Sequence, residues 1–274
     1  MKHQKIDPAG IPPYGAARIQ GVNWLGVWTL YVKEVRRFSN LYLQTILAPV
    51  VTTLLYFAIF ALAIGGSRPA VQGIPFTEFL APGLIMVAII QNAFANTASS
   101  ILGAKIQGNI VDLLMPPLSD GELAAAVIMG GVSRGIAVAL ANLIALSPFV
   151  SWQPPHPWAA VYFGIMASIC LSAGGLLSGI WAEKFDHMAS VTNFVILPLS
   201  FLSGSFYSVA LLPPMFQMIN SFNPFFYLID GMRYGFTGVA DSNIALGMAV
   251  SAMAATILWL TCYLVVKSGW RLKP

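Results

Sequence analysis

Six long apolar stretches dominate this sequence and leave little choice of fold class. They cover residues 43–64, 80–102, 123–149, 158–181, 188–209 and 244–266. A helix needs about 20 mostly apolar residues to cross the hydrocarbon core of a bilayer. We therefore expect an all-α, polytopic membrane protein with six transmembrane helices.

The scarcity of charge supports the same class. Only 9% of the residues are Asp, Glu, Lys or Arg, whereas 57% are hydrophobic. Soluble proteins carry about 25% charged residues. This composition argues against a soluble enzyme, a disordered chain and a nucleic-acid binder.

The distribution of basic residues predicts the orientation. Six spans place both termini on one side, and most Lys and Arg residues fall on that side: Lys2, Lys5, Arg18, Lys33, Arg36, Arg37, Lys105, Lys184, Lys267, Arg271 and Lys273. The opposite side holds only Arg68 and Arg233. Because cytoplasmic loops carry an excess of Lys and Arg, we expect both termini to be cytoplasmic.

The first of three segments that are not spans is 22–38. Val22, Leu25, Thr29 (or Trp28), Val32 and Val35 recur at helical spacing, and the charged residues Lys33, Glu34, Arg36 and Arg37 fall mainly elsewhere. This pattern predicts an amphipathic helix on the cytoplasmic membrane surface. It serves either as a membrane anchor or as a contact for a cytoplasmic partner.

The second segment is the cytoplasmic loop 103–122. Ile106, Ile110, Leu113 and Leu114 share one face of a short predicted helix that Pro116 and Pro117 end. An apolar face outside the membrane has to be covered. It either packs against the chain's own spans or docks into a groove of another protein.

The third segment, 201–233, is apolar but is broken by Gly and Pro into pieces shorter than a span. This pattern predicts helices that dip into the outer leaflet and return. Irregular backbone at that depth is stable only inside protein or along a cavity.

Signals for catalysis are weak. None of the three histidines has a partner at metal-ligand spacing, there is no phosphate-binding loop, and Cys170 and Cys262 lie in apolar runs typical of packing residues.

Arg134 is the one ionisable residue well inside a span. It either reaches the inner interface, which we favour slightly, or has a role inside the bundle. Gly131 with Gly135, and Gly175 with Gly179, predict close helix packing.

Uncharged polar residues in the spans are more informative. The second span carries Gln91, Asn92 and Asn96, and the fifth carries Asn193 and Ser200, next to Phe194 and Phe201. Polar groups in a membrane face protein or water. They either form hydrogen bonds between helices or line a pathway, and the aromatic residues either line it too or simply pack.

The order of these features resembles the permease subunit of type-2 ABC transporters, a mostly bacterial exporter family. The resemblance covers nearly the whole chain. It rests on the loop Gly108-Asn109-Ile110-Val111-Asp112-Leu113-Leu114-Met115-Pro116-Pro117, and on Ser203-Gly204, Leu212-Pro213-Pro214, Asn223-Pro224 and Asp230-Gly231-Met232-Arg233 before the last span. No single motif is diagnostic, but their order relative to six spans is fairly specific.

The resemblance implies a division of the chain and a set of roles. Residues 1–42 would be a cytoplasmic segment with an interfacial helix, 43–266 one transmembrane domain, and 267–274 a cytoplasmic tail. A coupling helix at about 104–115 would dock into an ATPase subunit, and re-entrant helices at about 211–238 would close an outer gate. The residues implied are Gly108, Asn109, Ile110, Asp112, Leu113, Leu114, Met115 and Pro116 for coupling; Val22, Leu25, Val32, Arg36 and Arg37 for the interfacial helix; and Pro213, Pro214, Asn223 and Pro224 for the gate.

The resemblance also implies partners and a location. Two copies of the chain would pair with two ATPase chains in a bacterial inner membrane. ATP and Mg²⁺ would bind to the ATPase, so that this chain itself would hold no cofactor. The pathway would lie between the two copies, lined mainly by the second and fifth spans, and its cargo would be an amphipathic lipid, a glycan-type molecule or a drug. The coupling segment carries almost no charge where relatives often have Glu and Arg, which argues against a specific salt bridge there but not against docking.

Two other classes remain as alternatives. A secondary transporter usually shows internal repeats and ionisable residues at the membrane midplane, and neither is evident here. A membrane scaffold without transport activity is the other possibility. Co-purification of an ATPase distinguishes the first interpretation from both.

Overall fold

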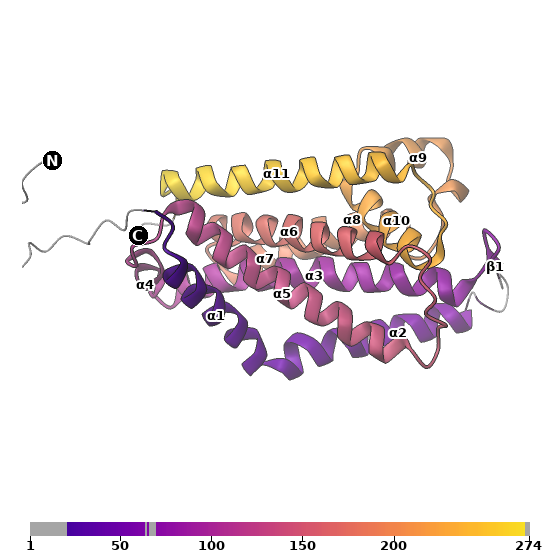
Figure 1. Cartoon of the computed structure of the whole chain (residues 1–274), viewed down its shortest axis with the longest axis horizontal. Helices are drawn as coiled ribbons and strands as arrows, with labels where there is room; N and C mark the ends of the chain where they lie inside the picture. Colours follow the sequence, from indigo (N-terminus) through magenta and orange to yellow (C-terminus); the bar gives the residue numbers. More distant parts are fainter. Residues whose placement is uncertain (1–20, 64, 66–69, 272–274) are drawn as a thin grey trace, which may run out of the picture.

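A computed structural model describes residues 21–63, 65 and 70–271, which are almost entirely helical (Figure 1). The elements are α1 (Trp24–Asn40), η1 (Leu43–Leu47), α2 (Ala48–Ala63), β1 (Ala70–Val71), β2 (Ile74–Pro75), α3 (Phe76–Ile106), α4 (Ile110–Leu114), α5 (Asp120–Leu146), α6 (Pro157–Trp181), α7 (Phe185–Val191), η2 (Thr192–Ile196), α8 (Leu197–Leu202), η3 (Val209–Leu211), α9 (Pro214–Ser221), α10 (Pro224–Thr237) and α11 (Ile244–Ser268). Strands β1 and β2 form a small antiparallel hairpin. Lys2, Lys5, Arg18, Ile64, Arg68 and Lys273 lie outside the described residues.

The six expected spans are confirmed. Within the described part of the chain, six helical segments are long and apolar enough to cross a membrane: Leu43–Ala63, Phe76–Ile106, Asp120–Leu146, Pro157–Trp181, Phe185–Leu202 and Ile244–Ser268. The chain is therefore an all-α polytopic membrane protein. Cys170 and Cys262 are free and buried, as expected of packing residues.

Several boundaries differ from the expected ones. The second span begins at Phe76 rather than near residue 80, so Pro82 lies inside α3 instead of in its first turn. The fifth span ends at Leu202, well before Val209. It ends there because Gly204 adopts a left-handed φ of +81°, and the Tyr207 hydroxyl donates to the carbonyl of Leu202 (2.9 Å).

Helix α3 is the centre of the bundle, in contact with α5, α6, α10 and α2. The predicted close packing of small residues is confirmed along it. A methyl group added to Gly175 of α6 would overlap Thr97 Oγ1 and the Phe94 carbonyl of α3. An added methyl at Gly131 would likewise meet Ser172 and Thr97. Glycine at these positions lets the backbones of neighbouring helices approach closely.

This contact predicts a marked effect of a small substitution. Gly175→Ala has to push α6 away from α3, and overpacking of this kind costs about 1–3 kcal/mol. We expect the unfolding temperature of the purified protein to fall by about 2–10 °C. Gly174→Ala is the matched control, because no atom lies within 4 Å of its added methyl. Equal unfolding temperatures for the two variants would contradict this packing.

The first and fifth spans are mostly exposed and share a local irregularity. Each contains a five-residue π-helical segment, η1 in the first and η2 in the fifth. In each, a proline follows two positions after the segment, Pro49 and Pro198. Proline has no N–H to donate to the preceding turn, and π-helical segments are frequent where the α-helical ladder is interrupted.

The two ends of the bundle differ. Helices α1 and α4 lie at the same end as the C-terminal end of α11, whereas the β1–β2 hairpin and α9 lie at the opposite end (Figure 1). The broken apolar segment before the last span forms two short helices, α9 and α10. Both lie within or next to the segment 211–238, for which re-entrant helices stay a prediction.

Candidate functional site: an exposed apolar face and a groove between the spans

Helix α4 is shorter than expected and presents a different face. Residues 104–106 belong to α3, and Gly108, with a left-handed φ of +74°, separates α3 from α4. Ile110 and Leu113 are buried against the bundle, so the prediction that they belong to a docking face is wrong.

The outer face of this segment is nevertheless apolar. Val111, Leu114 and Met115 are exposed, with Met115 at 75%. The other residues predicted for coupling, Gly108, Asn109, Asp112 and Pro116, are also exposed around them. Of the two interpretations left open, packing against the chain's own spans therefore applies to Ile110 and Leu113. Docking into another protein stays a prediction for the exposed residues.

The start of α1 is fixed to the loop that follows α4. The Asn23 backbone N–H donates to Glu122 Oε1 (2.7 Å), and its side-chain amide donates to the Pro117 carbonyl (3.1 Å). Glu122 also accepts from the Ser119 backbone, which completes a capping box at the start of α5. Helices α1, α4 and α5 therefore form one connected surface, with a groove of about 610 Å³ between α1 and the residues around α4.

The two faces of α1 differ in burial. The predicted apolar stripe lies away from the bundle, since Val22 and Leu25 are exposed and Val32 is half-buried. Arg36, which was also predicted for the interfacial helix, is exposed. The face against the bundle contains Leu30, Phe38 and the fully buried Glu34. Hydrophobic periodicity identified a real stripe, but it could not show which side of the helix contacts the protein.

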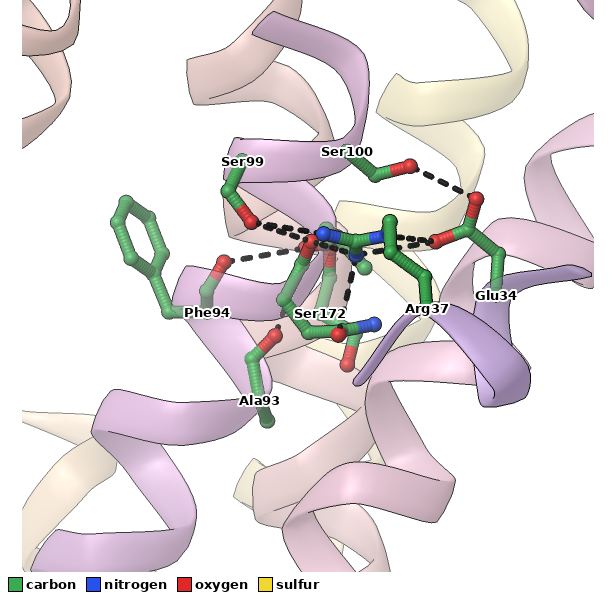
Figure 2. A network of polar contacts seen from close by, with 9 residues as sticks. Glu34, Arg37, Ala93, Phe94, Ser99, Ser100 and Ser172 are labelled. Atoms are coloured by element: carbon green, nitrogen blue, oxygen red, sulfur yellow. Dashed lines mark hydrogen bonds and ion pairs between the residues drawn. The ribbon is translucent and has the colours of Figure 1, made fainter. Parts of the chain in front are cut away.

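Figure 2 shows what holds the charged face of α1 in place. The Arg37 guanidinium pairs with Glu34 Oε2 (3.1 Å) and donates to the Asn96 carbonyl (2.7 Å), Asn96 Oδ1 (3.1 Å) and Ser99 Oγ (3.2 Å). Ser100 donates to Glu34 Oε1 (2.7 Å). Asn96, predicted to line a pathway, therefore forms part of an α1–α3 network instead. Ser99 and Ser100 lie about one turn beyond Asn96, and their contacts are the hydrogen bonds between helices that were one of the two interpretations of the polar residues in this span.

A groove with both apolar and polar walls, called the polar groove below for the side chains that distinguish it, lies between the first, second and fifth spans. Its volume is about 300 Å³, and the residues that line it include Gln44, Thr52, Thr53, Gln91, Asn92 and Thr192. Gln91 and Asn92 were predicted as pathway residues, and the structure brings both to this groove. The first span, which the sequence had not marked, contributes much of the opposite wall.

Arg134 contacts the same polar region from α5. Its guanidinium Nη2 donates to Asn92 Oδ1 (2.8 Å). This hydrogen bond favours a role inside the bundle over the slightly preferred alternative that Arg134 reaches the inner interface. Asn92 therefore links a cation of α5 to the wall of the groove.

The predicted residues of the fifth span do not gather at the groove. Asn193 and Phe194 are exposed on η2. Ser200 is buried and donates to the Ile196 carbonyl of its own helix (2.6 Å). Phe201 packs edge-on against Phe206. None of these four residues lines the groove with Gln91 and Asn92.

The opposite end of the bundle is fixed by side-chain caps. Pro213 precedes α9, and Pro214 and Pro224 are the first residues of α9 and α10. Asn223 caps α10 by accepting from the Phe225 N–H (3.0 Å), and it donates to Ser203 Oγ (2.7 Å). The four predicted gate residues are thus helix-start residues, and Pro224 lies deep in the bundle, in a pocket that Phe94 and Gly174 also line.

Two buried charges reinforce this end. Arg233 is 2% exposed, donates to the Gly204 carbonyl (2.6 Å) and lies over the Phe79 ring (3.9 Å). Asp230 is fully buried and accepts from the backbone of Asp241 and Ser242. Arg233 is therefore a bundle residue rather than an exposed loop charge.

The described residues contain no group of three or more His, Cys, Asp or Glu that could hold a metal ion. The arrangement that the structure does provide consists of an exposed apolar face at α4, a helix fixed next to it, and a groove between the spans.

Comparison with known proteins agrees with this arrangement. Residues 26–237 match the family model described as ABC-2 type transporter. The inner membrane transport permease YadH of Escherichia coli K12 is 37% identical over 247 residues, covering 90% of this chain and 96% of YadH. Nodulation protein J of Rhizobium leguminosarum bv. viciae is 24% identical over 254 residues, covering 88% of this chain and 92% of that protein.

Proposed function

Because this chain belongs to the ABC-2 type transporter family, as a multi-pass inner-membrane permease, we propose that it is the membrane half of an ATP-driven exporter. The family membership favours this reading over a secondary transporter or a scaffold. A partner ATPase would bind ATP and Mg²⁺, and this chain would supply the docking face and the pathway. The observation that supports this most is the exposed apolar face of Val111, Leu114 and Met115 at the end of the bundle where α1 also lies.

The proposed orientation places α1, α4 and both termini in the cytoplasm. Lys33, Arg36, Lys184, Lys267 and Arg271 are the described basic residues that agree with it. The exposed stripe Trp24, Leu25 and Trp28 of α1 would then lie on the inner leaflet. Helices α9 and α10 would be the re-entrant helices of the outer leaflet.

The pathway would lie at a contact between two copies of the chain. The first and fifth spans are the most exposed of the six, with 17% and 11% of their most apolar windows buried. Both border the polar groove through Gln44, Thr52 and Thr192. A second copy against this side would cover apolar surface and enclose the groove, whose mixed walls suit an amphipathic lipid, a glycan-type molecule or a drug.

ATP-driven movement would use two states of this assembly. Closure of the ATPase subunits would press on α4, and the permease would change from inward to outward access. The ATPase can shift this equilibrium only by fitting one permease state better than the other.

Transport by purified components tests the proposal. The permease is reconstituted into vesicles with the ABC ATPase encoded beside it, and ATP-dependent movement of labelled lipids, lipid-linked glycans and drugs is followed. We expect export of at least one class that requires both ATP and the ATPase. Movement driven by an ion gradient without the ATPase, or no complex between the two proteins, would contradict the proposal.

A further inference from the structure

The hydrogen-bond network between α1 and α3 contains a buried ion pair, which anchoring of α1 to the membrane surface does not require. Glu34 is fully buried, and Arg37 makes hydrogen bonds to two residues of α3 as well as its ion pair. Removing two charges from water is expensive, and well-packed apolar residues often stabilise a protein as well as a buried ion pair does. A buried pair is therefore weak evidence of a purely stabilising role.

The position of this network links the docking face to the groove. At its start α1 is fixed to the loop after α4 through Asn23 and Pro117, and to the first turn of α5 through Glu122. Four turns later Arg37 holds Asn96 of α3, and Asn92, one turn further along α3, lies in the groove wall. Helix α1 thus spans the distance from the docking face to the helix that lines the groove.

The direct connection between α3 and α4 is less suited to carry a movement. It consists of three residues, and Gly108 among them has a left-handed φ of +74° with no atom within 4 Å of an added methyl. By contrast, α1 is packed tightly against α5, where a methyl added to Gly130 would lie 2.5 Å from Glu34 Cβ. Helix α1 therefore provides a second connection from the α4 segment to α3, besides the direct contacts between α3 and α4.

On the far side of α3, Thr97 continues the connection. Its hydroxyl donates to the Ser172 carbonyl of α6 (2.7 Å), next to the contacts of Asn96 with Arg37 (Figure 2). One short stretch of α3 is thus held by α1 on one side and by α6 on the other. A displacement of α1 would reach both α3 and α6.

From these contacts we infer that Glu34 and Arg37 are positioning residues that transmit movement of the docking face to α3 and the polar groove. The inference rests on the proposed function, because it needs an ATPase that moves α4. It assigns to α1 a role in transmission beyond membrane anchoring and partner contact. Physical coupling of this kind requires an element that both sites bias, and the α1–α3 contact is that element.

The test separates transmission from stability. In Glu34→Met/Arg37→Met the ion pair is replaced by apolar side chains of similar length, whereas Arg37→Met alone leaves a buried carboxylate without its partner. Arg36→Met is the matched control, since Arg36 is an exposed neighbour on the same helix. Cys170 and Cys262 are replaced by Ala, and spin labels are placed at Thr52 and Asn193, exposed positions on the two spans that border the groove.

Four quantities are measured on the permease–ATPase complex: unfolding temperature, ATPase affinity, ATP hydrolysis, and the label distance with and without ATP–vanadate. We expect the double variant to keep the first three near those of the Arg36→Met control. The population that shifts with nucleotide should fall by about threefold or more, the scale typical of coupling residues. Arg37→Met alone should also unfold at a lower temperature.

The outcomes are distinct. If the double variant keeps the full nucleotide-dependent shift, or if the unsubstituted complex shows no shift, the inference is wrong. If the unsubstituted permease binds no ATPase, the proposed function fails instead. Ser99→Ala/Ser100→Ala provides a second variant, which removes two of the α3 contacts and keeps those of Asn96. It should reduce the shift, with a somewhat lower unfolding temperature because the buried Glu34 carboxylate loses one donor. An unchanged shift there would also contradict the inference.

Discussion

Aspartate at both Leu114 and Met115 is expected to abolish binding of the partner ATPase while the permease remains folded. The two side chains are 36% and 75% exposed, so their replacement costs the isolated chain little. In the proposed complex they would be buried in an apolar groove, where an unpaired carboxylate is strongly disfavoured. Loss of a central apolar anchor costs about 2 kcal/mol or more, which weakens the affinity by about 30-fold or more.

The measurement is the affinity of the detergent-solubilised permease for the purified ATPase, with the unfolding temperature as a check of folding. Gln107→Asp is the matched control, because it adds a charge to the same exposed surface without removing an apolar side chain. Leu114→Met/Met115→Leu should bind normally. An unchanged affinity of the double aspartate variant would exclude this face as the docking surface.

The inner face of the same helix behaves differently, and this difference marks a limit of sequence reasoning. The sequence predicted that a short apolar helix followed the second span, and that prediction is confirmed. It also placed Ile110 and Leu113 on the docking face, but both are buried against the bundle. In a five-residue helix every side is apolar enough to qualify, and only the tertiary contacts of α1 and α5 decide which residues turn inward.

The partners of the charged residues of α1 could not be predicted from the sequence either. Glu34 and Arg37 looked like the solvated side of a surface helix, yet their partners Asn96, Ser99 and Ser100 lie about 60 positions later in the chain. Local periodicity contains no information about such a partner. The spans themselves were predictable, because length and hydropathy are imposed by the bilayer and not by neighbouring helices.

The second large effect is expected from substitution of Asp230, at the other end of the bundle. Its carboxylate is fully buried and accepts from the Asp241 N–H (2.8 Å), the Ser242 N–H (2.9 Å) and the Ser242 hydroxyl (2.6 Å). Asp241 in turn accepts from Ser208 Oγ (2.7 Å) and Val209 N (2.9 Å). A single carboxylate of α10 therefore holds the loop that leads into α11 and, through it, the segment before α9.

Replacing Asp230 by Ala leaves these three donors without their acceptor. A buried donor without a partner costs about 1–3 kcal/mol, and part of this cost is recovered if the loop moves to water. We expect a loss of about 3 kcal/mol, measured as a fall of about 6–12 °C in unfolding temperature. Asp230→Asn keeps one acceptor oxygen, so its unfolding temperature should lie between those of Asp230→Ala and the unsubstituted protein.

Asp186→Ala is the control for this prediction, because it removes the same carboxylate from an exposed position. If Asp230→Ala proved as stable as Asp186→Ala, the loop would not depend on the carboxylate of α10.

The proposal that α9 and α10 form an outer gate leads to one more expected result for the same variants. A gate that opens has to keep the Asp230 contacts or exchange them, so proteolysis at 238–243 should increase in Asp230→Ala and remain unchanged in Asp186→Ala.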